Sequence, residues 1–175
     1  IGRAAWFAGW FADNELSHGG LYRRVWSEHA GREWIHFLKG VHGGIGKLND
    51  AWGARFESWD ALLQARPQPA VRTGRMYEDL LLFERHVVQE YVDVTIRVIR
   101  EVDSERLVFS NRFMAHDTGA YARVLDLYKA YDGIAVNLYP ANREPGLSAN
   151  ERDFLRMFHQ LTGRPVLVGE WSVPA

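Results

Sequence analysis

The second half of the chain alternates between helical and strand patterns, and this order constrains the fold more than any other feature of the sequence. It begins with apolar residues that recur every three or four positions over 75–102, which predicts a long amphipathic helix. In chain order there follow a strand at 106–111, a helix at 119–131, a strand at 133–140, a helix from Ser148 to about Leu161 and a strand at 165–170. Strands that alternate with helices pair in parallel through right-handed crossovers. An α/β fold with a parallel sheet is therefore predicted.

The helices carry local signals of their own. The predicted apolar stripe of the 75–102 helix consists of Met76, Leu80, Phe83, Val87, Tyr91, Val94 and Val98. The charged residues between them are expected to face solvent, namely Glu84, Arg85, Glu90 and Arg97. Ser148 and Glu151 have the spacing of a capping box, and Gly163 is expected to end the helix that they begin.

The first half contains one strand pattern and several short helical ones. Residues 5–13 (AWFAGWFAD) predict a buried strand, which an irregular segment at 16–30 follows. Residues 31–40 and 42–64 predict short helices. Prolines at 67 and 69 predict a loop before the long helix.

Composition excludes several classes of partner and cofactor. A net charge of −1 favours neither nucleic acid nor an anionic membrane, and no apolar run approaches the ~18 residues of a membrane span. The absence of cysteine excludes disulfides and thiolate metal sites and leaves the compartment open. The histidines at 18, 29, 36 and 42 lack the spacing of metal ligands, so we expect no metal or other cofactor. Most of the aromatic residues, including seven tryptophans, are expected in the core, and an excess of tryptophan is also what a sugar-binding cleft would add.

Polar residues stand where the predicted strands end. They are Asn14 and Glu15 after the first strand, Asn111 and Arg112 after the second, Asn137 and Tyr139 at the end of the third, and Glu170 at the end of the last. Parallel α/β folds place their active sites at the carboxyl ends of their strands. We therefore expect these side chains to converge on one edge of the sheet.

These residues carry a resemblance to a known group of enzymes. Asn14-Glu15 at one strand end, Tyr139 at a later one and Glu170 at the last resemble the second half of a clan A glycoside hydrolase, a (β/α)8 barrel. The segments GWFADNEL, LNDAWGARFESWDALL and VLVGEWSVPA are similar to segments of β-agarases and of bacterial β-galactosidases. The resemblance covers nearly the whole chain.

The resemblance implies a partial barrel with about strands four to seven and their helices. Barrel strands one to three and eight have no counterpart, and a complete barrel needs about 250 residues. Residues 1–175 are thus expected to form a single, incomplete catalytic domain, and the first residue, Ile1, fits a piece of a longer chain. The strand that ends at Tyr139 lacks the histidine expected from the family.

The resemblance also implies roles for the site residues. Glu170 would be the nucleophile and Glu15 the acid/base of a retaining mechanism, with carboxyl groups about 5–5.5 Å apart. The like charges of two close carboxylates would keep the acid protonated. Asn14 would bind the sugar 2-hydroxyl, and Tyr139 would stabilise the charged nucleophile. Asn111, Arg112, Asn137 and Trp171 complete the expected substrate-binding set.

Simpler interpretations exist for each of these residues. Glu15 and Glu170 are also compatible with acids at the start of loops, and Tyr139 with an ordinary half-buried aromatic. Arg112 could form a salt bridge to Asp103 or Asp117. Trp171 could pack in the core instead of stacking on sugar, and core packing is the preferred prediction for Trp10.

The predicted function is a retaining glycoside hydrolase that acts on a galactose-containing or related polysaccharide or oligosaccharide. One alternative is a barrel that binds carbohydrate without cleaving it, although both acids are present here. Another is a clan A hydrolase of glucan or mannan. The expected partners are a carbohydrate substrate and, through the open edges of the sheet, either a second copy or the rest of the barrel.

Overall fold

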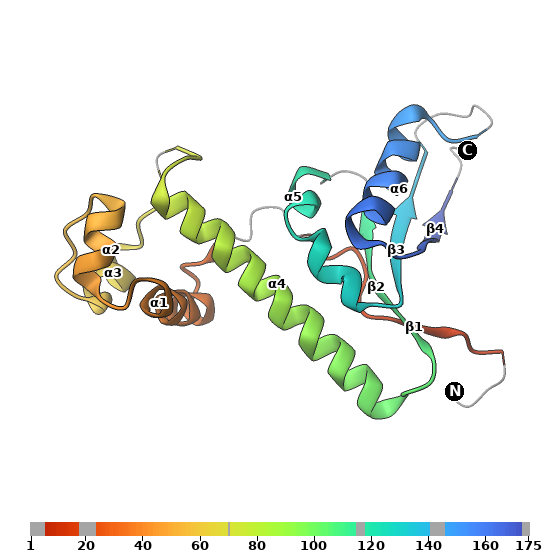
Figure 1. Ribbon diagram of the computed structural model, residues 1–175, viewed down its shortest axis with the longest axis horizontal. Helices are drawn as coiled ribbons and strands as arrows, with labels where there is room; N and C mark the ends of the chain where they lie inside the picture. Colours follow the sequence, from red (N-terminus) through yellow and green to blue (C-terminus); the bar gives the residue numbers. More distant parts are fainter. Residues whose placement is uncertain (1–5, 18–23, 70, 115–117, 141–145, 173–175) are drawn as a thin grey trace. The chain divides into compact units, whose positions relative to one another are not determined.

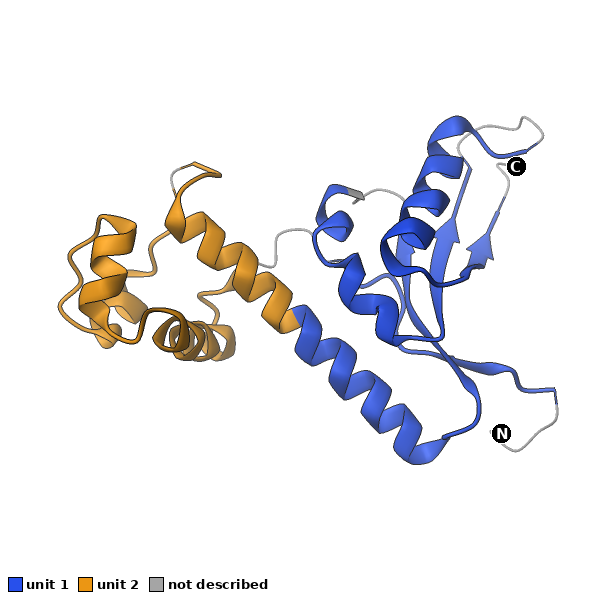
Figure 2. Cartoon of the chain, viewed as in Figure 1, with its two compact units in different colours: residues 1–19, 88–175 blue, residues 20–87 orange. Residues whose placement is uncertain are grey.

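A computed structural model describes residues 6–17, 24–69, 71–114, 118–140 and 146–172. The chain divides into two compact units, one formed by residues 1–19 and 88–175 and the other by residues 20–87 (Figure 2). We call them the sheet unit and the helical unit and describe each by itself. Helix α4 (Arg75–Val102) contributes residues to both. The single catalytic domain over residues 1–175 stays a prediction.

The sheet unit is a parallel α/β structure. Its strands are β1 (Gly9–Phe11), β2 (Leu107–Met114), β3 (Gly133–Leu138) and β4 (Val166–Trp171). They lie in the order β1-β2-β3-β4, and each pairs in parallel with the next. Helix α5 (Thr118–Ala122) and the 3-10 helix η2 (Leu125–Ala130) connect β2 to β3, and α6 (Ala149–Thr162) connects β3 to β4 (Figure 1). The four strands form a curled half-barrel, so the predicted fold, a partial (β/α)8 barrel, is confirmed.

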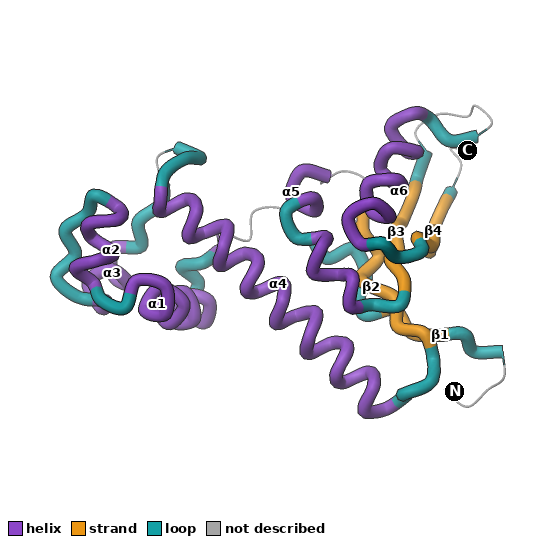
Figure 3. The backbone as a smooth tube through the Cα atoms, viewed as in Figure 1, coloured by secondary structure: helices purple, strands orange, loops and turns teal. Residues whose placement is uncertain are grey.

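Helices cover one face of the sheet (Figure 3). An aromatic cluster fills the space between these helices and the sheet. Phe113 of β2 is fully buried, with ring centroids 4.9 Å from Tyr121, 4.9 Å from Tyr128 and 5.0 Å from Phe158. These rings come from β2, α5, η2 and α6. They bury one face of the sheet; the other face, which we call the inner face, carries the polar residues Arg112, Asn137 and Glu170 together with apolar ones.

Two one-residue register shifts interrupt the sheet. Phe109 pairs with Gly133 but Arg112 pairs with Ala135, so β2 has one residue more than β3 in this interval. At this interruption a side chain takes the place of a main-chain acceptor, because the Ser110 hydroxyl accepts a hydrogen bond from the Ala135 N–H at 3.0 Å. Between β3 and β4 the extra residue is Gly169. Such β-bulges redirect the side chains that follow them.

Several predicted boundaries in the sheet unit are wrong. The first strand covers only 9–11, and Phe11 is 42% exposed because β1 is an edge strand whose inner face no helix covers. The second strand continues to Met114, which leaves Asn111 and Arg112 inside it instead of at its end. The predicted 119–131 helix is divided into α5 and η2. The predicted capping box is confirmed, since Ser148 and Glu151 bind each other's backbone N–H at the start of α6.

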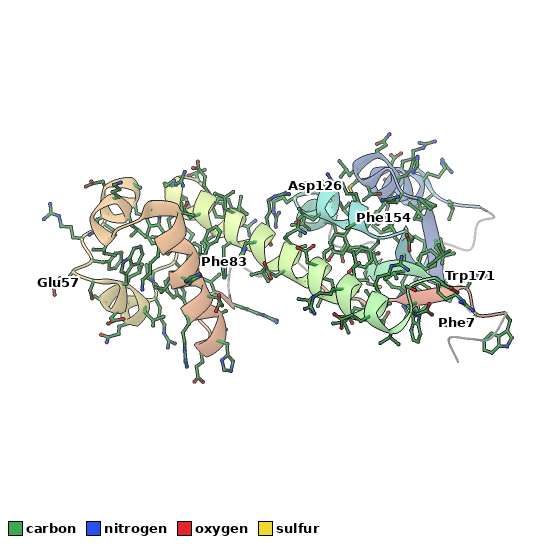
Figure 4. The ribbon with its side chains drawn as sticks, turned by 60° about the horizontal axis from the view of Figure 1, so that its bottom comes forward. Phe7, Glu57, Phe83, Asp126, Phe154 and Trp171 are labelled. Atoms are coloured by element: carbon green, nitrogen blue, oxygen red, sulfur yellow. The ribbon has the colours of Figure 1, made fainter. Side chains whose placement is uncertain are left out.

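The helical unit consists of α1 (Glu28–His42), α2 (Ile45–Trp52), α3 (Trp59–Ala65) and the first part of α4. Trp34 is fully buried at its centre, with its ring 5.0 Å from that of Phe83. Phe83 lies inside this unit and Glu57 at its surface (Figure 4). The short helices predicted in this part of the sequence are thus confirmed.

The predicted apolar stripe of α4 is only partly correct. Leu80 and Phe83 are buried, but Val87, Val94 and Val98 are 37%, 43% and 46% exposed. The buried positions instead include two acids, Asp79 and Glu84, so the prediction of a solvated Glu84 is wrong.

The buried side of α4 makes hydrogen bonds as well as apolar contacts. Asp79 accepts hydrogen bonds from His42 Nε2 at 2.8 Å and Trp52 Nε1 at 2.7 Å. Within the sheet unit, the Thr95 hydroxyl lies 2.5 Å from that of Tyr131.

None of the helices in the described ranges is long and apolar enough to cross a membrane.

Candidate active site

Glu15 follows β1 and is held by main-chain contacts to β2. Its N–H donates to the carbonyl of Arg112 at 3.0 Å, and Asn14 forms an isolated bridge with the same residue. Glu15 has a φ of 55°, in the left-handed region that residues other than glycine seldom adopt. The Leu16 N–H donates to Asn111 Oδ1 at 2.8 Å, and Asn111 Nδ2 donates to the Leu16 carbonyl at 3.4 Å. These contacts fix the backbone on both sides of Glu15.

Asn137 connects Glu15 to the neighbouring strands. It lies near the end of β3 and is 1% exposed. Its Nδ2 donates to Glu15 Oε1 at 2.8 Å and to Asn14 Oδ1 at 3.3 Å. In the sheet register Asn137 pairs with Glu170 of β4. Glu15 therefore binds this buried amide directly, and Glu170 occupies the position beside it in the sheet.

Glu170 faces this amide because of the bulge at Gly169. Val168 pairs with Val136, whose side chain points toward the helices. In a regular strand Glu170 would share the face of Val168, because side chains alternate. The extra residue moves Glu170 into register with Asn137, on the inner face.

Two donors stabilise the negative charge of Glu170. Arg112 forms an ion pair through its Nη1 with Glu170 Oε1. The Tyr139 hydroxyl donates to Glu170 Oε2 at 2.5 Å. This hydrogen bond is the main reason that the pKa of Tyr139 is raised above its usual value, which favours the protonated, donating form of the phenol. Glu15, by contrast, accepts a side-chain hydrogen bond from a neutral amide, that of Asn137.

Arg112 pairs with Glu170, whereas the sequence analysis had considered Asp103 and Asp117 as its partners. Asp103 accepts hydrogen bonds from Trp10 Nε1 at 3.0 Å and from the main chain at 105 and 106. The Trp10 contact is the largest cause that lowers the pKa of Asp103. Trp10 itself is only partly buried, so it is not the core residue that we expected. Asp117 lies outside the described residues.

Two members of the predicted substrate-binding set lie away from the cluster of acids. Asn111 is fully buried, and both groups of its amide bind the main chain of Leu16. Trp171 pairs with Leu138, which places it on the face of β4 opposite Glu170, and it is 70% exposed at the end of the strand (Figure 4). It is therefore not a core residue.

The structure adds two residues that the sequence analysis did not single out. Gly169 is the extra residue of the β4 bulge, and the Phe11 ring lies under the Arg112 guanidinium at 5.3 Å. A glycine inside the apolar run VLVGEW is a known signal of a bulge or of a close backbone approach. Nothing in the sequence pairs Phe11 with a residue 101 positions later.

The cluster fits acid/base and nucleophilic chemistry on a neutral substrate. It combines one carboxylate that an arginine and a phenol stabilise as an anion with a second carboxyl group next to a neutral amide. Within the described ranges, no group of three or more histidine, aspartate or glutamate residues is arranged to hold a metal ion.

Comparisons with known proteins bear on the family and the fold of this chain. Beta-galactosidase BgaH of Haloferax lucentense is 27% identical over 184 residues, which cover 93% of this chain and 27% of that protein. An agarase structure, AgWH50C, superposes with a TM-score of 0.73 at 22% identity, covering 95% of this chain and 24% of the agarase. The beta-galactosidase structure from Halorubrum lacusprofundi has a TM-score of 0.65 at 23% identity, and the match covers 97% of this chain and 28% of that protein. At these identities the two structures establish the fold alone.

The chain spans about a quarter of the length of the curated relatives that it matches, 21% of one and 27% of another. A family match covers nearly all of it. The model of glycoside hydrolase family 42, described as Beta-galactosidase, matches residues 2–173, and the chain therefore belongs to this family of glycoside hydrolases.

Proposed function

We propose that this chain supplies the catalytic pair of a retaining β-glycosidase, with Glu170 as nucleophile and Glu15 as acid/base. The observation that carries the proposal is the position of Asn137, which donates to Glu15 at 2.8 Å and pairs in the sheet with Glu170. A double displacement needs two carboxyl groups about 5–5.5 Å apart, and the placement of Glu15 and Glu170 around Asn137 supports such a spacing. The names of the relatives, beta-galactosidase and agarase, support a galactose-containing oligosaccharide or polysaccharide as substrate.

In the first step a carboxylate oxygen of Glu170 attacks the anomeric carbon. The bond from that carbon to the leaving oxygen breaks, and Glu15 transfers its proton to this oxygen. In the second step Glu15 removes a proton from water, the water oxygen attacks the same carbon, and Glu170 leaves as a carboxylate. Arg112 and Tyr139 stabilise that carboxylate before and after the covalent stage. Asn14 is the candidate donor to the sugar 2-hydroxyl.

Replacing each glutamate by alanine in a complete barrel that includes this chain distinguishes the two roles. Glu170→Ala should abolish turnover, because no covalent intermediate can form. Glu15→Ala should slow turnover by roughly 10²–10⁴-fold on substrates whose leaving group needs a proton. The loss should be much smaller on a dinitrophenyl β-galactoside, whose leaving group departs unprotonated.

Glu15→Gln is the matched control for shape, since its amide keeps the size of the side chain. An equal loss of rate for Glu15→Ala on activated and unactivated galactosides would contradict the acid/base role. Product analysis by NMR gives an independent measurement, because retention requires that the β-anomer is released first.

A further inference from the structure

Arg112 contacts the surroundings of both glutamates. Its carbonyl accepts the N–H of Glu15 at 3.0 Å, and its own N–H donates to the Asp13 carbonyl at 3.3 Å. Its guanidinium forms the ion pair with Glu170 and lies 5.3 Å from the centroid of the Phe11 ring. The main chain of one residue thus supports Glu15 while its side chain binds Glu170.

The path of the Arg112 side chain passes over Gly169, the bulge residue next to Glu170. A Cβ at position 169 would lie 2.9 Å from Arg112 Cδ and 3.5 Å from Arg112 Cγ. These atoms are in the middle of a side chain whose far end is bound to Glu170, so they cannot move aside while the ion pair is kept. Gly169 is not among the glycines with positive φ, and its backbone conformation therefore does not require glycine. What requires glycine here is the space that Arg112 occupies.

The arrangement is not the most stable one for an arginine. Among the described residues, no group accepts a hydrogen bond from Arg112 Nε, which is buried. An unsatisfied buried donor is unfavourable for folding. The contact with Glu170 is thus kept although part of the guanidinium is left without a partner, which points to a role in the site and not in the fold.

We infer that Arg112 is a positioning residue that orients the Glu170 carboxylate for attack, and that Gly169 acts by leaving room for it. This differs from the substrate-binding role expected for Arg112. It rests on the proposed function, because it presumes that Glu170 is the nucleophile. In this role Arg112 affects the rate of covalent bond formation and not the binding of the sugar.

The test measures how fast the nucleophile is labelled by an activated 2-deoxy-2-fluoro-β-galactoside in a complete barrel that includes this chain. Mass spectrometry of peptides locates and times the label. Arg112→Lys, Arg112→Ala and Gly169→Ala should each slow labelling of Glu170 by about 10²-fold, a loss that a misplacement near 1 Å can cause. Gly119→Ala is the matched control, because a Cβ at Gly119 of α5 meets nothing within 4 Å.

The double variant Arg112→Ala/Gly169→Ala tests whether Gly169 acts through Arg112. Without Cγ and Cδ at position 112 the added methyl group has room, so Gly169→Ala should cost less than about 3-fold in that background. Added guanidinium ions should restore part of the labelling rate of Arg112→Ala. The relief in the double variant shows that Gly169 acts through Arg112, and the rescue by guanidinium is the result that a purely structural role does not predict. The Kd for galactose should stay within about 2-fold of the unmodified protein throughout.

The outcomes separate the inference from the function on which it rests. If the unmodified protein is labelled at Glu170 and the Arg112 variants are labelled equally fast, the positioning role is wrong and the proposed function stands. A large increase in the Kd for galactose with an unchanged labelling rate would return Arg112 to substrate binding. If the unmodified protein is not labelled at Glu170, both are wrong.

Discussion

At the scale of single residues, the buried amide of Asn137 determines how close the two acids lie. A polar group within an apolar strand is unfavourable unless it is hydrogen-bonded. The Nδ2 of Asn137 meets this requirement through Glu15 and Asn14, two residues more than 120 positions earlier in the chain, whereas its buried Oδ1 accepts no hydrogen bond from the described residues. The sequence indicated that Asn137 needs a polar partner, and the structure identifies the partner as Glu15.

Asn137→Asp should therefore destabilise the protein in a pH-dependent way. The new carboxylate would lie beside Glu15 and Glu170, and burial together with like charges would raise its pKa above the unfolded value. The stability difference from the unmodified protein should be small near pH 4, where the new group is neutral. It should grow as the pH rises, to about 3 kcal/mol at pH 7.

Urea unfolding at pH 4 and pH 7, followed by tryptophan fluorescence, measures this difference. The matched control is Asn14→Asp, because Asn14 is exposed and uses only its oxygen, as an acceptor from Asn137. Equal losses for the two variants at pH 7 would show that burial of Asn137 is not what matters.

At the scale of elements, the start of α6 is one of the places where a local sequence signal and the structure agree. Glu151 N–H donates to the Ser148 hydroxyl at 3.3 Å, and Ser148 N–H donates to Glu151 Oε2 at 2.6 Å. Ser148→Ala should cost about 1 kcal/mol. Hydrogen exchange should show faster exchange in the first turn of α6.

Ser27 provides the control, because it occupies the N-cap of α1 without a side-chain hydrogen bond to that helix. Ser27→Ala should leave exchange in α1 unchanged within about 0.5 kcal/mol. A loss as large as that at Ser148 would argue against the capping bond as the cause.

The contact of α4 with the segment before β3 predicts a loss of stability in alkali. Burial raises the pKa of Tyr131 to about 12, and burial likewise raises the pKa of Tyr91 and Tyr128. A raised folded-state pKa gives stability that is complete below the unfolded value of about 10. It is lost as the pH rises through the folded value. For Tyr131 alone the loss between pH 10 and 12 should be about 3 kcal/mol.

Urea unfolding between pH 8 and 12 tests this prediction. In Tyr131→Phe the free energy of unfolding should fall less steeply with pH, by the slope that corresponds to about one proton. Thr95→Val removes the hydroxyl that lies 2.5 Å from that of Tyr131 but keeps the tyrosine. The slope of the free energy of unfolding against pH should therefore remain in this variant. A pH dependence that is identical in Tyr131→Phe and the unmodified protein would assign the loss to other groups.

At the scale of the whole molecule, the sheet formed by the described residues ends in two strands that are paired on one side only, β1 and β4. Unpaired strand edges are templates for association. The inner face also carries exposed apolar side chains, among them Phe11 and Leu167 at 42% and 41% exposure. In a complete barrel the other strands would cover both the edges and this face.

We therefore expect the 175-residue chain, expressed alone, to self-associate and to lack useful glycosidase activity. Contacts from further strands are needed to orient the sugar, and positioning contributes several kcal/mol to catalysis. Sedimentation velocity measures the association, and an aryl β-galactoside measures the activity. A soluble monomer that cleaves this substrate at near-enzymatic rates would contradict the expectation. Activity should return when the flanking strands are supplied.

The sequence by itself determined the elements whose causes are local. The alternation of strands and helices, the capping box at Ser148 and the acids after apolar runs depend on residues close together in the chain, and each could be predicted. The tertiary structure alone decided which residues meet. The stripe of α4 was mispredicted because the partners of Asp79 lie on other helices. The ion pair from Arg112 to Glu170 was missed because it depends on a one-residue bulge, which changes the face of a side chain without changing the hydrophobic pattern.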